Sequence, residues 1–197
     1  MQLQKRTMAI AGIVMFIYLI FHMLSNLTFF SKELFNDFYD GYNAGFIRWP
    51  VLIVMVVIVA VHVRTALKIR AVNAKARTVD YHRHDKLKIP AALVTVSVLF
   101  LLAFMVIHVI QTLDFDTADV YQQTVALFQS FWMLTFYMAG LFVLTMHLQH
   151  SLANVFQTLG KTSLSCQYLA WGVTLSLTGG FALLPLYIYF VMPRQIT

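Results

Sequence analysis

Four histidines, one in each of four long apolar stretches, are the residues of this chain best suited to chemistry. They are His22, His62, His108 and His147. An imidazole in membrane hydrocarbon is costly unless something binds it, so four of them predict ligands for a buried group. Haem iron takes two axial ligands, and one imidazole from each of two facing helices can supply them. The pattern therefore predicts two bound haems.

The stretches that carry these histidines are long enough to cross a bilayer. Apolar residues make up 60% of the chain and charged residues 11%, which excludes an ordinary soluble domain. Each run reaches the about 20 residues that span the hydrocarbon. We expect an all-α integral membrane bundle of five transmembrane helices, forming one domain over residues 1–197. Four helices form the dihaem core and one is peripheral. The predicted spans are residues 8–30, 49–69, 89–113, 123–149 and 165–192.

The basic residues divide unevenly between the two predicted membrane faces. Eleven of the 14 Lys and Arg residues lie on the face that carries the N-terminus, and six of the eight acids lie on the other. The positive-inside rule then predicts a multi-pass protein of the cytoplasmic (inner) membrane, with its N-terminus cytoplasmic and its C-terminus outside. The net charge of +6 reflects this topology and not nucleic-acid binding. Docking of an acidic partner or of anionic membrane lipid on the basic face is left open.

Depth in the membrane decides how the histidines pair. His22 and His108 lie about 12 and 9 Å from the outer ends of their helices, at 1.5 Å per residue. His62 lies about 9 to 12 Å from the inner end of its span, and His147 lies roughly 34 Å down the fourth span. We therefore pair His22 with His108, and His62 with His147.

The residue four positions after each histidine shares its helix face and would clash with a flat macrocycle if it were bulky. At that offset the chain has Asn26, Ala66, Thr112 and Ser151, all small or modest. Gly140, two turns before His147, would relieve crowding further. Small residues also serve ordinary packing of membrane helices, which is the alternative.

Other polar residues have weaker claims to a role. His150 is a second candidate for the ligand at His147, or a neighbour of a haem propionate. Arg64 either pairs with a propionate or extends its charge to the membrane surface. His82 and His84 lie in a charged segment and are expected to be solvated. The lone Cys166 cannot form an internal disulfide and is expected to pack as a small apolar residue.

These segments resemble the single-chain, five-helix, dihaem cytochrome b subunit of succinate dehydrogenases and menaquinol:fumarate reductases. The resemblance implies His22, His62, His108 and His147 as axial ligands of two haem b groups. It also implies a flavoprotein subunit and an iron–sulfur subunit on the cytoplasmic side, where the dicarboxylate chemistry would lie. With His108 in the third span, the resemblance covers four of the five helices. The matching segments are Lys5–Gly12, Phe21–Leu27, Phe35-Asn36, His62–Leu67 with the basic tail Asn73–Arg77, and His147–Gly160.

Two departures from the family pattern stand near the last ligand. Ser151 replaces a frequent glycine and is still small. Thr145 stands where some dihaem fumarate reductases have a glutamate. The second departure argues against a transmembrane proton route built on that glutamate.

The expected function is electron transfer between the iron–sulfur partner and a membrane quinone, menaquinone or ubiquinone, by way of the inner and then the outer haem. Quinone chemistry consumes or releases protons and needs a protonatable group at the bilayer edge. Candidates in the first outer loop are Glu33, Asp37, Tyr39, Asp40 and Tyr42, although each could be an ordinary solvated residue. A second possible quinone site lies near the inner haem.

Two other functions stay open. A gamma-type cytochrome b of another respiratory enzyme, such as nitrate reductase or formate dehydrogenase, would place two haem ligands on one helix. A histidine-lined metal or proton transporter would add intramembrane carboxylates or helices interrupted at the midplane. The predicted spans contain neither, apart from Pro185 in the fifth.

Overall fold

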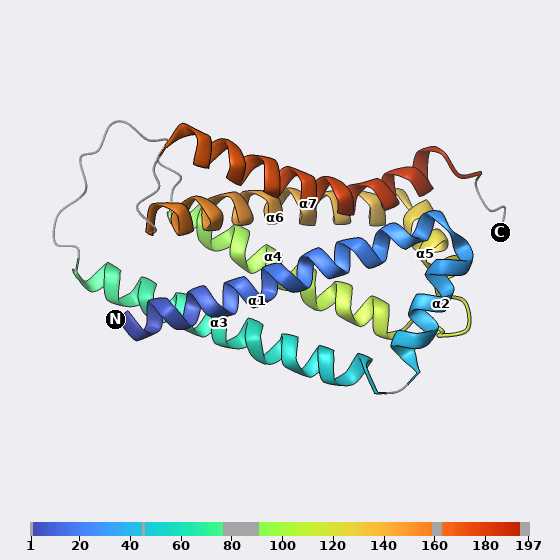
Figure 1. Cartoon of the computed structure of the whole chain (residues 1–197), viewed down its shortest axis with the longest axis horizontal. Helices are drawn as coiled ribbons and strands as arrows, with labels where there is room; N and C mark the ends of the chain where they lie inside the picture. The colour runs from blue at the N-terminus through green and yellow to red at the C-terminus, as the bar shows by residue number, and fades with distance from the viewer. Residues whose placement is uncertain (1, 45, 77–90, 159–162, 194–197) are drawn as a thin grey trace. The chain divides into compact units, whose positions relative to one another are not determined.

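The computed structural model describes residues 2–44, 46–76, 91–158 and 163–193, and every regular element in these ranges is a helix (Figure 1). Five helices are long and apolar enough to cross a membrane. The predicted all-α, multi-pass membrane architecture is thereby confirmed. The elements are α1 (Gln2–Leu27), η1 (Thr28–Phe30), α2 (Lys32–Asn43), α3 (Arg48–Ala76), α4 (Ala91–Leu113), α5 (Val120–Gln129), α6 (Phe131–Thr158) and α7 (Leu164–Phe190).

The fourth predicted span differs from the observed helices. The sequence suggested one helix over residues 123–149, but Ser130 takes an extended conformation (φ −77°, ψ 124°) and separates the short α5 from the long α6. Asp119 begins α5 as its N-cap, because its side chain accepts the backbone N–H of Gln122 at 3.0 Å. The membrane span therefore starts at Phe131, and His147 lies about 24 Å along it.

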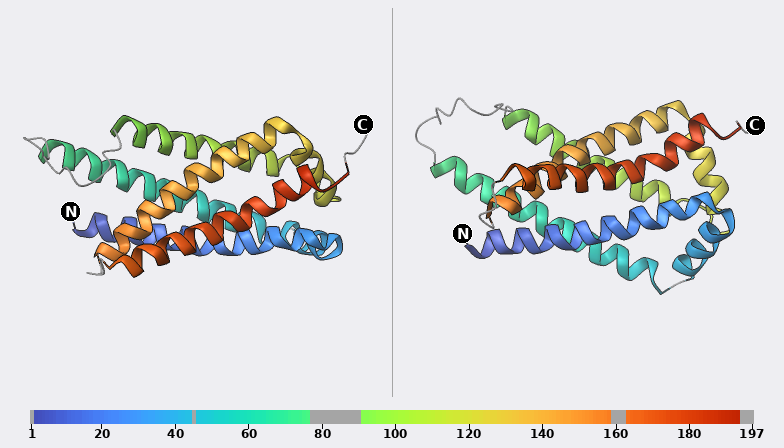
Figure 2. Two further views of the ribbon diagram at one scale, coloured as in Figure 1. Left: turned by 90° about the horizontal axis from the view of Figure 1, so that it is seen from above. Right: turned by 45° about the horizontal axis from the view of Figure 1, so that its top comes forward.

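The chain divides into two compact units, which we describe separately. The first unit comprises residues 1–21 and 42–89, and the second comprises residues 22–41 and 90–197. In the first unit, the beginning of α1 lies beside the second half of α3, with Gly12 next to His62. In the second unit, α6 packs along α7, α4 packs on α6, and α5 contacts both α6 and α7 (Figure 2).

The core of the second unit is an aromatic cluster built around Phe29 and Phe35. The Phe29 ring stacks on Tyr121 with 4.4 Å between centroids and 8° between planes. Asn36 joins α2 to α5, because its Oδ1 accepts the backbone N–H of Tyr121 at 3.2 Å. The predicted outer loop therefore contains an amphipathic helix, α2, with Phe35 buried on one side. The buried cluster consists of Phe29, Phe35, Val120, Val125, Phe128, Tyr137, Leu184 and Ile188.

The fifth span is more deeply packed than a peripheral helix would be. Small residues recur on one face of α7, among them Ala170, Thr174, Thr178 and Gly180, and all four are buried. Small side chains let the backbones of membrane helices approach closely. This close approach explains why α7 buries so many residues against α5 and α6.

Candidate functional site

The structure brings the predicted outer pair of histidines together in the second unit. His22 near the end of α1 and His108 in α4 have ring centroids 5.8 Å apart, with 58° between the ring planes. Two imidazoles on opposite sides of one metal, at bond lengths of about 2 Å, have centroids about 6 Å apart. The separation of the two rings therefore fits a pair of axial ligands.

A hydrogen-bonded chain holds the His108 ring. The Tyr137 hydroxyl of α6 donates to Gln111 Oε1 at 2.8 Å and lies 3.1 Å from His108 Nδ1. A hydroxyl has one proton, so toward His108 this oxygen can only accept. His108 Nδ1 therefore carries the proton, and Nε2 has the lone pair that a metal requires. The Gln111 amide is oriented by its own donation to Met133 Sδ at 3.3 Å.

Aromatic packing fixes the Tyr137 ring that anchors this chain. Tyr137 is buried and packs edge-on against Phe128, with 4.8 Å between centroids. It also contacts Phe104 and Phe136 edge-on, at 5.3 and 5.9 Å. A ring held on three sides has little rotational freedom, so its hydroxyl stays at one position in the apolar core. The orientation of His108 is thereby set by the core of the unit.

Two glycines let bulky side chains approach this pair of histidines. A Cβ at Gly140 would lie 2.5 Å from the Phe104 ring, which itself lies parallel to His108 at 6.1 Å. Gly140 was expected to relieve crowding next to His147, and in the structure it makes room for Phe104. At Gly180 a Cβ would lie 2.6 Å from Met23 Sδ, next to His22 in the sequence. The confined Phe104 ring requires glycine at position 140, whereas a Cβ at position 180 would require the flexible Met23 side chain to shift.

An aromatic ring of α7 packs against the outer pair, and α2 is joined to α1 close to it. Phe181 lies 5.4 Å from the His22 ring, between centroids. One turn further along α1, Asn26 Oδ1 accepts the Tyr39 hydroxyl proton at 3.1 Å. Of the five expected quinone-binding candidates, Tyr39 is thus the one that joins the packed core of the second unit.

The other quinone candidates point elsewhere. Glu33, Asp37 and Asp40 are exposed. Tyr42 is partly covered, and burial raises the pKa of its hydroxyl, with Arg48 opposing this effect.

The inner pair is divided between the two units. His62 belongs to the first unit, where its Cε1 would lie 3.8 Å from a Cβ at Gly12. His147 belongs to the second unit and is half-buried on α6, and His150 is exposed on the same helix. The pairing of His62 with His147, and the possible substitution by His150, stay predictions. His82 and His84 lie outside the described residues.

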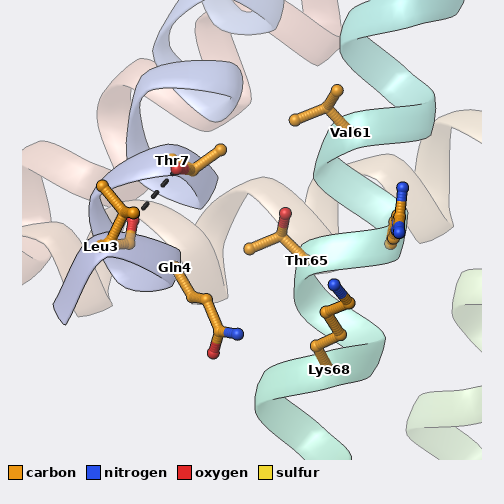
Figure 3. A pocket seen from close by; sticks show the side chains of 7 residues that line it. Leu3, Gln4, Thr7, Val61, Thr65 and Lys68 are labelled. Carbon is orange, nitrogen blue, oxygen red and sulfur yellow. Dashed lines mark hydrogen bonds between the residues drawn. The ribbon is translucent and has the colours of Figure 1, made fainter. Parts of the chain in front are cut away.

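Arg64 lines a groove on a different side of α3 from His62. Arg64 follows His62 by two residues, and this spacing corresponds to a rotation of about 200° around an α-helix. The groove has a volume of about 330 Å³ and is lined by Leu3, Gln4, Thr7, Val61, Arg64, Thr65 and Lys68 (Figure 3).

A second groove begins at the hydrogen-bonded chain of His108. It has a volume of about 340 Å³ in the second unit, and Gln111 contributes both to the groove and to the chain. Its carboxylate, Asp114, is exposed, and the Gln123 amide is held by the backbone of Asp116 and Asp119. The lining residues are Gln111, Asp114, Phe115, Gln123, Ala126 and Leu127.

Comparisons with known protein families, with curated proteins and with solved structures gave no match. The assignment of a function therefore rests on the residues of this chain.

The outer pair provides two imidazoles, which is the number of protein ligands that a haem requires. Within the described ranges, no three His, Cys, Asp or Glu side chains gather as a metal-binding group.

Sequence reasoning missed Tyr137, Gln111 and Gly12 as members of the site. For Tyr137 a signal existed, because a phenol in an apolar span needs a hydrogen-bond partner. For Gly12 the signal was its place in a segment that already carried the family resemblance.

Proposed function

We propose that this protein is the dihaem cytochrome b membrane subunit of a succinate:quinone oxidoreductase, acting as a succinate dehydrogenase or a quinol:fumarate reductase. The observation that carries the proposal is the contact of His108 Nδ1 with the Tyr137 hydroxyl at 3.1 Å, together with the His22 ring at 5.8 Å from the His108 ring. Because Tyr137 donates its proton to Gln111, we assign the His108 proton to Nδ1, which leaves Nε2 for a metal. Metal-binding histidines commonly donate their second nitrogen in this way. An imidazole that only packed against its neighbours would need no facing imidazole.

Each histidine has a stated role in this proposal. His22 and His108 hold the outer haem, and His62 and His147 hold the inner one. When bound, the haems supply one-electron carriers between an iron–sulfur subunit on the basic face and a membrane quinone. Tyr137 keeps His108 in the tautomer that binds metal, and the aromatic core keeps water away from the pair.

The groove beside Gln111 is the proposed quinone site. Phe115 and Leu127 offer apolar contact for a quinone ring, and Asp114 is placed to exchange protons with the outer aqueous phase. Its volume of about 340 Å³ is within the range of small-molecule sites. Gln111 belongs both to this groove and to the chain that ends on His108, so a quinone bound there would adjoin the outer ligand pair.

Haem content of single-ligand variants tests the proposal. The purified wild-type protein should contain two haems per chain, by pyridine haemochrome assay against protein mass. His22→Ala and His108→Ala should each retain one haem and lose the same spectral component. His62→Ala and His147→Ala should lose the other component.

His150→Ala is the matched control, since this exposed histidine lies one turn from His147. It should keep both haems. A wild-type protein without haem would refute the proposal, as would unchanged haem content in His22→Ala and His108→Ala. The oxidoreductase assignment has its own test, because flavoprotein and iron–sulfur subunits should co-purify with the chain. Isolation with other redox partners would favour a different respiratory enzyme.

A further inference from the structure

The groove between α1 and α3 in the first unit combines cations with polar side chains. Arg64 and Lys68 are exposed along its α3 side, and Gln4 and Thr7 line its α1 side (Figure 3). The Thr7 hydroxyl donates to the carbonyl of Leu3 at 3.0 Å and so keeps its lone pairs outward. The groove therefore presents two positive charges and an amide within one small volume.

Thr65 adds a donor at the base of the groove. Its side chain is only 8% exposed, and among the residues that the structure describes its hydroxyl forms no hydrogen bond. The hydroxyl lines the groove, so it is available to donate a hydrogen bond to a ligand there.

The charge balance of the first unit gives the sign of that ligand. The described parts of this unit, residues 2–21, 42–44 and 46–76, contain basic residues and no Asp or Glu. Among these described residues, no carboxylate is present to neutralise Arg64 and Lys68. An anion fits this groove, and a zwitterion would find no partner for its cationic group.

The position of the groove in the membrane gives the source of the anion. The first membrane span begins at Leu3 and the second ends at Asn73, so the groove lies where both spans meet the membrane surface. Phosphates of lipid head groups lie at that level, and basic grooves between transmembrane helices bind them. Leu3 and Val61 flank the groove with 77% and 38% of their surfaces exposed, and they offer contact to acyl chains.

We infer that this groove binds the phosphodiester of an anionic phospholipid such as phosphatidylglycerol. Arg64 and Lys68 bind the phosphate oxygens, and Thr65 donates a hydrogen bond to one of them. A haem propionate is the competing anion for Arg64. The position of Arg64, about 200° around α3 from His62, favours the lipid.

Lipid retention by the full-length protein tests this inference. Wild-type protein is placed in nanodiscs with equal amounts of phosphatidylglycerol and phosphatidylcholine, extracted in mild detergent, and weighed by native mass spectrometry. The wild-type protein should retain phosphatidylglycerol in preference to phosphatidylcholine. The double variant Arg64→Gln/Lys68→Gln should retain about 25-fold less, because each basic side chain that binds the phosphate should contribute about five-fold in binding.

Two further variants make the test specific. Arg6→Gln/Lys75→Gln removes the same charge from exposed residues outside the groove lining and should bind lipid as wild type does. Thr65→Val keeps the shape of the side chain and removes one hydrogen bond, so retention should fall about five-fold. It serves as the test if the double variant does not fold.

Haem content of the same preparations separates lipid from propionate. The inference requires unchanged haem with reduced phosphatidylglycerol in Arg64→Gln/Lys68→Gln. Loss of haem with full lipid retention would overturn it in favour of the propionate. Equal retention of phosphatidylcholine, or equal losses in Arg6→Gln/Lys75→Gln, would also overturn it. A wild-type chain without haem would refute the proposed function and leave the lipid measurement valid.

Discussion

Replacing Tyr137 by phenylalanine removes one oxygen atom and with it both hydrogen bonds that orient His108. The ring of Tyr137 stays in place, because Phe104, Phe128 and Phe136 pack against it. Only the acceptor for His108 Nδ1–H and the donor to Gln111 Oε1 are lost. The substitution therefore isolates the hydrogen bond from the packing.

The size of the effect follows from the value of one hydrogen bond. A bond from Nδ1–H makes an imidazole a stronger electron donor to iron and stabilises the ferric state. Its net value in a protein is about 1 kcal/mol. For a one-electron couple, a tenfold change in the equilibrium constant is about 1.4 kcal/mol and corresponds to about 59 mV. A loss of about 1 kcal/mol should therefore raise the midpoint potential of the outer haem by about 40 mV. The inner haem, held by His62 and His147 in the proposal, should not change.

Redox titration of the purified protein, followed by haem absorbance, measures both potentials. Tyr168→Phe is the matched control, because this exposed tyrosine lies in α7 away from the outer pair. It should leave both potentials unchanged. If Tyr137→Phe keeps two haems and both potentials equal those of wild type, the role given to Tyr137 is refuted. An equal shift of both potentials would also refute it.

Two further predictions concern the packing and pH dependence of the second unit. Gly140→Ala should destabilise the protein by about 1 to 3 kcal/mol, because its Cβ would lie 2.5 Å from the confined Phe104 ring. Gly172→Ala, which meets nothing within 4 Å, should stabilise it slightly, and thermal unfolding in detergent compares the two; equal effects would contradict the argument. Burial, and then the nearby Tyr187, raises the pKa of Tyr121, so the folded state favours the neutral phenol. The stability of the wild-type protein should therefore fall as pH rises above about 10, because the tyrosine ionises first in the unfolded chain. The stability of Tyr121→Phe should fall less over the same alkaline unfolding series, and an equal fall in both proteins would contradict the argument.

The helices could be predicted from the sequence because membrane spans depend on length and composition alone. All five expected spans overlap observed ones. The break at Ser130 was missed, because the segments before and after it are both rich in apolar residues and a single extended residue leaves no pattern. The helix α2 was also missed, since Phe35 and Tyr39 are buried only by tertiary contacts with residues such as Tyr121.

The site was predicted in part, for a related reason. Counting residues gives the depth of His22 and His108, and depth sufficed to pair them. The contact of Tyr137 with His108 depends on the rotation of α6 about its axis and on its position beside α4. Neither quantity follows from apolar composition, because lipid accepts any apolar face.

The distribution of burial gives a reason to expect a cofactor beside the histidine-bearing helices. None of the residues in the most apolar eighteen-residue stretch of α3 or of α4 is buried, whereas nearly half of those in α7 are. Lipid can cover the valines and leucines of α3 and α4 at no cost, since acyl chains are as apolar as they are. It cannot form a hydrogen bond with an imidazole, which in hydrocarbon needs a polar partner or a metal. Tyr137 pairs with one nitrogen of His108, and in the proposal the haem takes the second nitrogen.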